Sequence, residues 1–255
     1  MKKMKKFFLA LGFIFLYVCV GALTAYLLHI SGRYPSGDDT MYHIYRAEFL
    51  VESFKSNNFF PLYNPYMYNG VQLFRYFAPA SAYGIALFSL AGQIFLPQDA
   101  YIGYELYTGF VFFLGALGFL TVGLKKDRLF LGGFLGLLWF FTPSVMYQYF
   151  VAGNLTMGFC LACTPYLYGA VFSYIETKDV KRIKQIVLSS AFILLGHVGF
   201  GGMVLLALLL FMLLYRLIML KEEKFSVLSI VFMILTGALL DGIWALPSLI
   251  GGKTS

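Results

Sequence analysis

The first apolar run of the chain, residues 7–30, limits the fold more than any other feature. It is about 24 residues long and contains no Asp, Glu, Lys or Arg, and roughly 20 apolar residues suffice for a helix to cross a membrane. Charged residues make up only 12% of the chain, about half of what a soluble domain carries. The sequence therefore predicts an all-α polytopic membrane protein. Further apolar runs follow at 83–96, 100–124, 129–149, 155–175, 186–220 and 225–250.

Basic residues stand in short clusters between the apolar runs, at 2–6, 125–128 and 178–184. Such clusters stay on the cytoplasmic side of a bilayer and contact anionic lipid heads. They do not form the extended basic surface of a nucleic-acid-binding protein, so the net charge of +7 predicts no nucleic-acid partner. All the cysteines lie in apolar runs, where we interpret them as packing residues and assign no metal ligands: Cys19, Cys160 and Cys163.

The lengths of two apolar runs decide the topology. The run 83–96 has about 14 residues, too few for a span, so we interpret it as a re-entrant or membrane-surface helix. The run 186–220 is too long for one span, and the glycines around His197 predict two helices with a turn between them. The result is about seven spans in the cell membrane, with a cytoplasmic N-terminus and an extracytoplasmic C-terminus.

This topology divides the chain into a first transmembrane helix at 1–30, an extracytoplasmic loop at 31–99 and a six-helix membrane scaffold at 100–255. The loop begins with two adjacent carboxylates, Asp38 and Asp39. One reading is a general base at the membrane surface, and the other is an N-terminal cap for the helix that follows.

An amphipathic pattern from residue 40 predicts a helix along the membrane surface. Its residues His43 and Arg46 follow Asp39 at intervals of four and three positions, which places all three on one side of the helix. That combination suits a phosphate-bearing lipid head, and the alternative is a solvated polar face. The aromatic segment 59–77 that comes next is either an interfacial anchor or a platform for sugar rings or a polyprenyl chain.

Three more ionisable residues lie in or beside the apolar runs near the predicted outer face: Glu105, His197 and Asp241. Ionisable groups within a membrane are costly and mark functional cavities by default, so we predict that these residues contribute to substrate binding. The alternative is that they form polar pairs or cap backbone groups.

The motif order of the loop resembles the first outer loop of GT-C type membrane glycosyltransferases. The residues that carry the resemblance are Gly37-Asp38-Asp39, His43, Phe60-Pro61-Leu62-Tyr63-Asn64-Pro65-Tyr66, Asn69-Gly70 and the segment 74–79. More narrowly, the chain resembles bacterial multi-spanning membrane proteins that carry the description "6-pyruvoyl-tetrahydropterin synthase-related". No soluble pterin-synthase pattern is visible, so we do not expect that chemistry.

The resemblance implies a sugar donor linked to a polyprenyl phosphate and a cell-envelope acceptor. It gives the role of base to Asp38 or Asp39, while Arg46, Arg75 and His43 would stabilise the leaving phosphate. It identifies no cofactor and is compatible with a divalent metal. Relatives often carry a second acidic residue in the next outer loop, where this chain has Asn154.

The resemblance covers the N-terminal portion of longer relatives, so we expect an N-terminal part of such an enzyme or a chain with a C-terminal partner subunit. Two alternatives stay open. A lipid-linked-sugar flippase or transporter would use Asp241 and the broken run 186–220. A non-catalytic membrane partner, or a degenerate fragment, would need none of these acids for catalysis.

Overall fold

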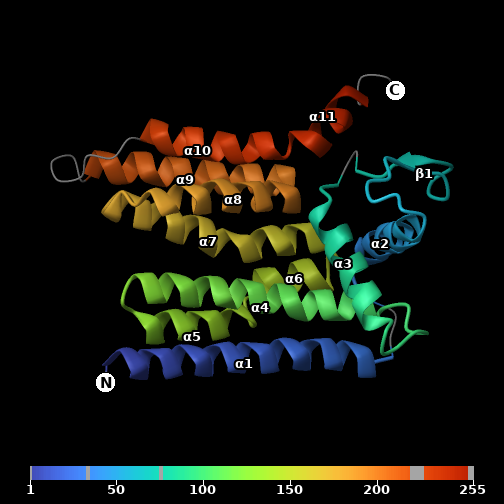
Figure 1. The fold of residues 1–255 in the computed structure, drawn as a ribbon, viewed down its shortest axis with the longest axis horizontal. Coiled ribbons are helices and arrows are strands. Elements are labelled where there is room, and N and C mark those ends of the chain that lie inside the picture. The colour runs from blue at the N-terminus through green and yellow to red at the C-terminus, as the bar shows by residue number, and fades with distance from the viewer. Residues whose placement is uncertain (1, 33–34, 75–76, 219–226, 252–255) are drawn as a thin grey trace.

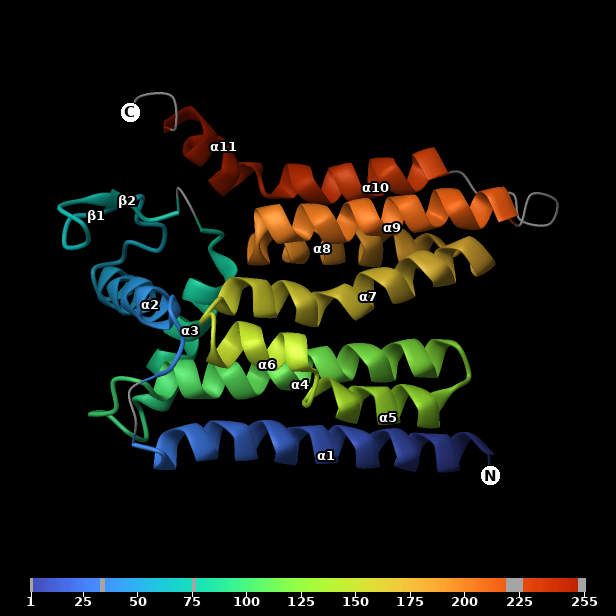
Figure 2. The ribbon, with the colours of Figure 1, turned by 180° about the vertical axis from the view of Figure 1, so that it is seen from behind.

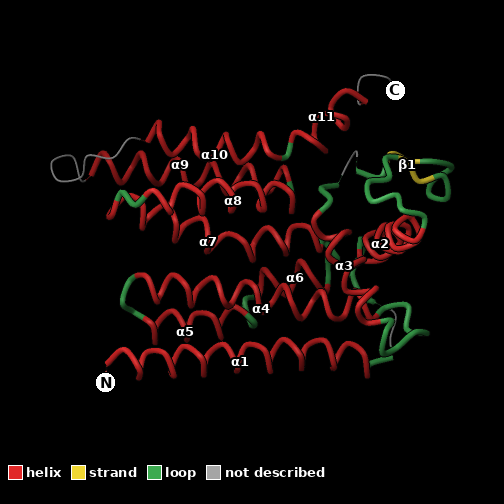
Figure 3. Tube along the Cα trace, in the orientation of Figure 1, coloured by secondary structure: helices red, strands yellow, loops and turns green. Residues whose placement is uncertain are grey.

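The computed structural model describes residues 2–32, 35–74, 77–218 and 227–251. Most of this chain is helical, and most helices lie side by side along one direction (Figures 1 and 3). The expected all-α membrane protein is therefore confirmed. The long bundle is formed by α1 (Lys2–Ile30), α4 (Ile102–Lys125), α5 (Leu129–Trp139), α6 (Pro143–Phe150), α7 (Leu155–Thr177), α8 (Val180–Gly196), α9 (Val198–Ile218) and α10 (Val227–Leu240).

The remaining elements gather at one end of the bundle, which we call the loop end (Figures 1 and 2). They are α2 (Thr40–Lys55), the antiparallel pair β1 (Tyr63–Asn64) and β2 (Val71–Gln72), α3 (Ala80–Gly92) and α11 (Gly242–Gly251). The opposite end, which we call the basic end, carries the start of α1 and the α4–α5 and α7–α8 turns. The basic clusters at 2–6, 125–128 and 178–184 thus share one end of the bundle, as the predicted topology requires.

Five helical segments of the described chain are long and apolar enough to cross a membrane: Lys3–Ile30, Ile102–Lys125, Leu129–Phe150, Leu155–Thr177 and Val198–Ile218. Two apolar helices, α3 and α10, are shorter. The short run before α4 does form a short helix, α3, which packs against α2 and α4. Length and composition therefore establish a multi-pass membrane protein, while the expected count of seven spans stays a prediction.

The interruptions of the helices follow local chemistry. The break predicted at His197 is present, since α8 ends at Gly196 and α9 begins at Val198. Two further breaks divide runs that the sequence predicted as single helices. One falls before α6, where Thr142 is extended and Pro143 cannot donate a backbone hydrogen bond. The other falls at Asp241, between α10 and α11.

Small residues allow the helices of the bundle to approach closely. A Cβ on Gly21 of α1 would lie 2.8 Å from the carbonyl oxygen of Gly109 on α4. Gly123 of α4 and Gly132 of α5 meet in the same way, with a Cβ on Gly132 only 2.6 Å from the Cα of Gly123. Lipid supplies little hydrophobic drive between helices, so such close backbone packing is a main source of their association.

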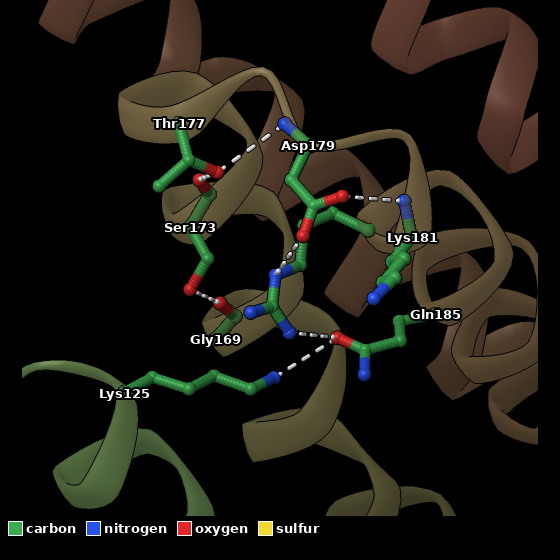
Figure 4. A network of polar contacts seen from close by, with 8 residues as sticks. Lys125, Gly169, Ser173, Thr177, Asp179, Lys181 and Gln185 are labelled. Carbon is green, nitrogen blue, oxygen red and sulfur yellow. Dashed lines mark hydrogen bonds and ion pairs between the residues drawn. The ribbon is translucent and has the colours of Figure 1, made fainter.

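A polar network ties α4 to α8 at the basic end (Figure 4). The side-chain oxygen of Gln185 accepts hydrogen bonds from Lys125 Nζ at 3.0 Å and from Arg182 at 2.9 Å. Asp179 caps α8 by accepting from the backbone N–H of Lys181 at 2.9 Å. The ion pairs Lys6–Asp127 and Lys126–Glu176 link further elements at this end. The charged groups of the basic end thus serve mainly to connect helices.

Candidate functional site at the loop end

The turn that carries Asp38 and Asp39 is fastened to the loop before α7. The backbone N–H of Asp38 donates to the carbonyl of Val151, and that of Asp39 donates to the carbonyl of Ala152, both at 3.2 Å. Such paired main-chain bonds between distant segments hold the turn in a defined position. The two carboxylates are therefore mounted on the bundle and do not belong to a free loop.

Neither carboxylate caps α2 in the described chain, although a cap was one of the two readings that the sequence left open. Asp39 occupies the N-cap position of α2 with αR backbone angles, and its side chain accepts no capping hydrogen bond. The turn is closed instead by Thr40, whose hydroxyl donates to the carbonyl of Ser36 at 2.7 Å. Among the described residues neither aspartate has a hydrogen-bonded or ion-paired side-chain partner, and Asp38 is exposed whereas Asp39 is half-buried.

Helix α2 buries two residues of its predicted polar face, His43 and Arg46, and exposes Glu48, Glu52 and Lys55. His43 and Arg46 are both 0% exposed, while Tyr45 is 50% exposed. The reason is tertiary packing, because α2 lies against α3 and the end of the aromatic segment, where it contributes Ile44 and Leu50 to the core. The polar residues of α2 are therefore outward in its C-terminal half and buried at His43 and Arg46.

Arg46 organises the segment that precedes α3. Its Nη2 donates to the carbonyl oxygens of Leu73 and Phe77, both at 3.0 Å. The guanidinium lies 5.5 to 5.6 Å from the ring centres of Tyr42, Phe74 and Phe77, within the range of cation–π attraction. Its Nε and Nη1 are buried and have no hydrogen-bond partner among the described residues. Arg46 is thus a buried cation that fixes the backbone of the aromatic segment.

His43 lies one turn before Arg46 and is held by rings. It contacts Phe77 edge to face, with ring centres 5.4 Å apart, and neither ring nitrogen has a hydrogen-bond partner among the described residues. Burial, together with the charges of Arg46 and His197, lowers the pKa of His43 from 6.5 to about 3. The imidazole is therefore neutral at physiological pH.

A groove of about 950 Å³ runs beside α2 and the aromatic segment. Its polar and aromatic lining includes Tyr45, Glu48, Glu52, Asn64, Tyr66 and Tyr68. Tyr68 also packs against Tyr42, one turn after Asp39, with ring centres 6.3 Å apart. Partial burial raises the pKa of the Glu48 carboxyl. We did not predict a role for either glutamate, because their spacing of four residues on an amphipathic helix indicates only a solvated stripe.

The other predicted residues occupy three separate places at the loop end. The His197 Nδ1 accepts the backbone N–H of Phe200 at 3.1 Å, so it caps α9. Glu105 lies in the first turn of α4 and contacts His29. Asp241 is 4% exposed, and both of its carboxylate oxygens are buried without a hydrogen-bond partner in the described chain. Arg75 lies outside the described residues.

Asn154 has a structural task. Its side-chain oxygen accepts the backbone N–H of Met157 at 3.1 Å and the hydroxyl of Thr156 at 2.7 Å, which caps α7. Asn154, at the position where the resemblance implied a second acid, therefore serves here as a helix cap.

A second groove, of about 640 Å³, lies between α4, α7 and α8. Its walls are mainly apolar, with Phe110, Phe159 and Phe192 among them, and Lys125 and Gln185 border it. Because these two polar residues belong to the basic end, this groove is not part of the site around Asp38.

The comparison with protein families gives one result. The family model of the 6-pyruvoyl-tetrahydropterin synthase related domain, described as a membrane protein, matches residues 74–255. No curated protein and no solved structure matches the chain. The family match covers α3 to α11, more than half of the chain, and begins after the aspartate turn and α2. The chain thus belongs to the family of 6-pyruvoyl-tetrahydropterin synthase-related membrane proteins.

Proposed function

We propose that this protein is a GT-C-like glycosyltransferase, or the N-terminal part of one, that uses a polyprenyl-phosphate-linked sugar. The observation that carries the proposal is the turn at Asp38 and Asp39. Both carboxylates lack side-chain partners in the described chain, and backbone bonds to Val151 and Ala152 hold their turn against the bundle. Preorganisation of this kind is what a general base needs, because geometry comes before pKa in proton transfer.

In the proposed reaction a hydroxyl of the acceptor attacks the anomeric carbon of the donor sugar. The carboxylate of Asp38, which is the more exposed of the pair, accepts the hydroxyl proton. The new C–O bond forms as the bond to the lipid phosphate breaks, and the phosphate leaves with the electron pair. A base of this type contributes about 10²- to 10⁴-fold to a rate.

The groove beside α2 suits the acceptor. Tyr66 and Tyr68 are 89% and 78% exposed, and such rings offer flat apolar faces for a sugar, while Glu48 and Glu52 can accept hydrogen bonds from its hydroxyls. Tyr42 connects this groove to the aspartate turn, because it packs on Tyr68 and lies one helical turn after Asp39.

The burial of Arg46 and His43 changes the roles that the resemblance implied for them. Neither side chain has exposed surface, so in this conformation neither can contact a phosphate. Arg46 acts as a positioning residue through the carbonyls of Leu73 and Phe77. We assign no phosphate-binding residue on this basis.

The proposed orientation places the basic end in the cytoplasm and the loop end outside, with about seven spans. It rests on the positive-inside rule, because the basic clusters of the described chain share one end. The loop 31–99 would then meet lipid-linked donors and acceptors on the outer face, above the scaffold 100–255.

The experiment uses the full chain, purified and reconstituted in vesicles, with a panel of radiolabelled polyprenyl-phosphate sugars and cell-envelope acceptors. Transfer is compared for wild type, Asp38→Asn and Asp39→Asn at equal protein level. We expect Asp38→Asn to lose at least about 100-fold in rate. The matched control is Asp127→Asn, which changes an exposed aspartate at the basic end and should leave transfer unchanged.

Two results would contradict the proposal. One is the absence of turnover and of donor binding with every donor, with or without added membrane extract that could supply a partner subunit. The other is transfer that both aspartate variants retain, which would remove the base from this turn.

A specific observation favours a transporter as the second candidate. Asp241 is a buried carboxylate without a hydrogen-bond partner among the described residues, at the break between α10 and α11. Interrupted helices with intramembrane acids are typical of transporters. The two functions differ in the essential acid. Transport of a lipid-linked sugar that depends on Asp241 and tolerates Asp38→Asn would identify a flippase.

A further inference from the structure

A second cluster of ionisable side chains lies at the loop end, apart from the aspartate turn. It joins His29 in the last turn of α1, Glu105 in the first turn of α4 and Asp99 in the segment before α4. The His29 Nδ1 is 3.0 Å from Asp99 Oδ2 and 3.1 Å from Glu105 Oε2. One ligand atom from each residue lies within 4.8 Å of the other two.

An ion pair accounts for only part of this arrangement. The Nδ1 of His29 carries at most one proton, so it can serve one carboxylate well. Hydrogen-bond geometry is met with Glu105, whereas the buried Asp99 Oδ2 accepts no hydrogen bond from any residue that the structure describes. Among the described residues, His29 is the only basic side chain within ion-pair distance of Asp99 or Glu105. Two carboxylates thus share a single imidazole, and the Glu105 side chain is only 9% exposed.

A backbone hydrogen bond from a residue outside the cluster orients the Asp99 carboxylate. Asp99 Oδ1 accepts the backbone N–H of Tyr101 at 2.8 Å, which directs Oδ2 toward His29. Hydrogen bonds of this type hold the carboxylate ligands of metal sites in place.

We propose that His29, Asp99 and Glu105 bind a divalent transition-metal ion. The edge between neighbouring ligands in an octahedron with bonds of about 2.1 Å is about 3.0 Å, which matches the two contacts of His29. Two carboxylates and a neutral imidazole balance the charge of a dication. The mixed nitrogen and oxygen donors favour Mn²⁺, Fe²⁺ or Zn²⁺ over Mg²⁺ and Ca²⁺, which prefer oxygen alone.

The bound ion would join the end of α1 to the start of α4. These two helices already pack closely through Gly21 and Gly109, and the metal adds a clip at the loop end. An ion that binds only the folded state stabilises that state by mass action. This role is structural, so the metal-site proposal goes beyond sugar transfer and does not depend on the proposed function.

The test uses the full chain in detergent micelles, stripped with a chelator and titrated with Mn²⁺. Electron paramagnetic resonance of free Mn²⁺ counts the bound ions, and electron spin-echo modulation detects a coordinated imidazole nitrogen. We expect one Mn²⁺ per chain, a nitrogen signal, displacement by Zn²⁺ and a higher melting temperature. His29→Gln should remove the nitrogen signal and weaken binding at least tenfold.

Two further variants keep the result interpretable. Asp99→Asn lies in a loop, retains an oxygen for the Tyr101 N–H and should weaken binding without loss of fold. His197→Gln is the matched control, because it changes a histidine that caps α9 at the same end, and it should keep the nitrogen signal. Unsaturable binding, a nitrogen signal that survives in His29→Gln, or unchanged affinity in Asp99→Asn would overturn the metal site.

Discussion

Gly37 and Gly153 meet backbone to backbone beneath the two aspartates of the candidate site. A Cβ on Gly37 would lie 2.6 Å from the Cα of Gly153, and a Cβ on Gly153 would lie 2.6 Å from the backbone nitrogen of Thr40. Both glycines have positive φ, +110° and +66°. At each position, therefore, both the lack of space and the backbone conformation disfavour any residue with a side chain. The position of the carboxylates therefore depends on two residues without side chains.

The first prediction follows from this contact. Gly37→Ala and Gly153→Ala should each destabilise the fold by about 2 kcal/mol or more, because the new methyl group collides with backbone in a left-handed conformation. Thermal unfolding in detergent measures the change. Gly12→Ala is the control, since a Cβ on Gly12 of α1 would meet no other part of the described chain within 4 Å, and the stability of this variant should be unchanged or slightly increased.

The second prediction concerns the cap of α7. Asn154→Ala should cost about 1 kcal/mol, because the backbone N–H of Met157 and the hydroxyl of Thr156 lose their acceptor. Asn154→Asp keeps an acceptor oxygen in the same place and should retain wild-type stability. Equal losses in the two variants, measured by the same unfolding assay, would contradict the capping role.

The third prediction concerns pH and His43. The pKa of His43 is about 3 in the folded protein and 6.5 as the ordinary value, so the unfolded chain binds more protons between these limits. Stability should be full above pH 6.5 and should fall as the pH drops toward 3, by at most about 1.4 kcal/mol per unit from this residue. His43→Phe should flatten the dependence of melting temperature on pH in this window, whereas His197→Gln should leave most of it, because the charge of His197 is the smallest of the three causes that lower the pKa of His43.

The fourth prediction concerns Arg46. Arg46→Ala should destabilise the protein by about 3 kcal/mol or more, because it leaves a cavity and removes the donors to the carbonyls of Leu73 and Phe77. Arg46→Lys should also destabilise, since an ammonium group lacks the planar fork and stacks less well on the three surrounding rings. Limited proteolysis of the segment before α3, together with the melting temperature, reports the effect. Wild-type behaviour of Arg46→Ala in both assays would contradict its positioning role.

Much of the helical architecture could be predicted from apolar run lengths and glycines. The interruption at His197 is the clearest example, because the glycine-rich segment around it predicted a break, although Gly199, Gly201 and Gly202 themselves lie within α9. The breaks at Pro143 and Asp241 carried weaker signals. A proline within an apolar run is compatible with either the start of a new helix or a bend. A lone aspartate in an apolar run does not indicate whether the helix continues or ends there.

The orientation of α2 could not be predicted, for a physical reason. Periodicity shows that a helix has two unlike faces but does not show which neighbour covers which face. The rings of Phe74 and Phe77 supply Arg46 with an environment that only the folded chain assembles. The cluster of His29, Asp99 and Glu105 was likewise invisible, because its members belong to three segments that meet only through packing of α1 on α4.

The unequal ends of the bundle give the folded molecule a permanent electric dipole along its long axis. Lysines and arginines occupy the α4–α5 and α7–α8 turns, while free and clustered carboxylates occupy the opposite end. In an energised membrane each elementary charge moved across 100 mV is worth about 2.3 kcal/mol. In the proposed orientation, with the basic end on the negative cytoplasmic side, the transmembrane voltage would therefore act on the whole bundle and favour the inserted orientation over the inverted one.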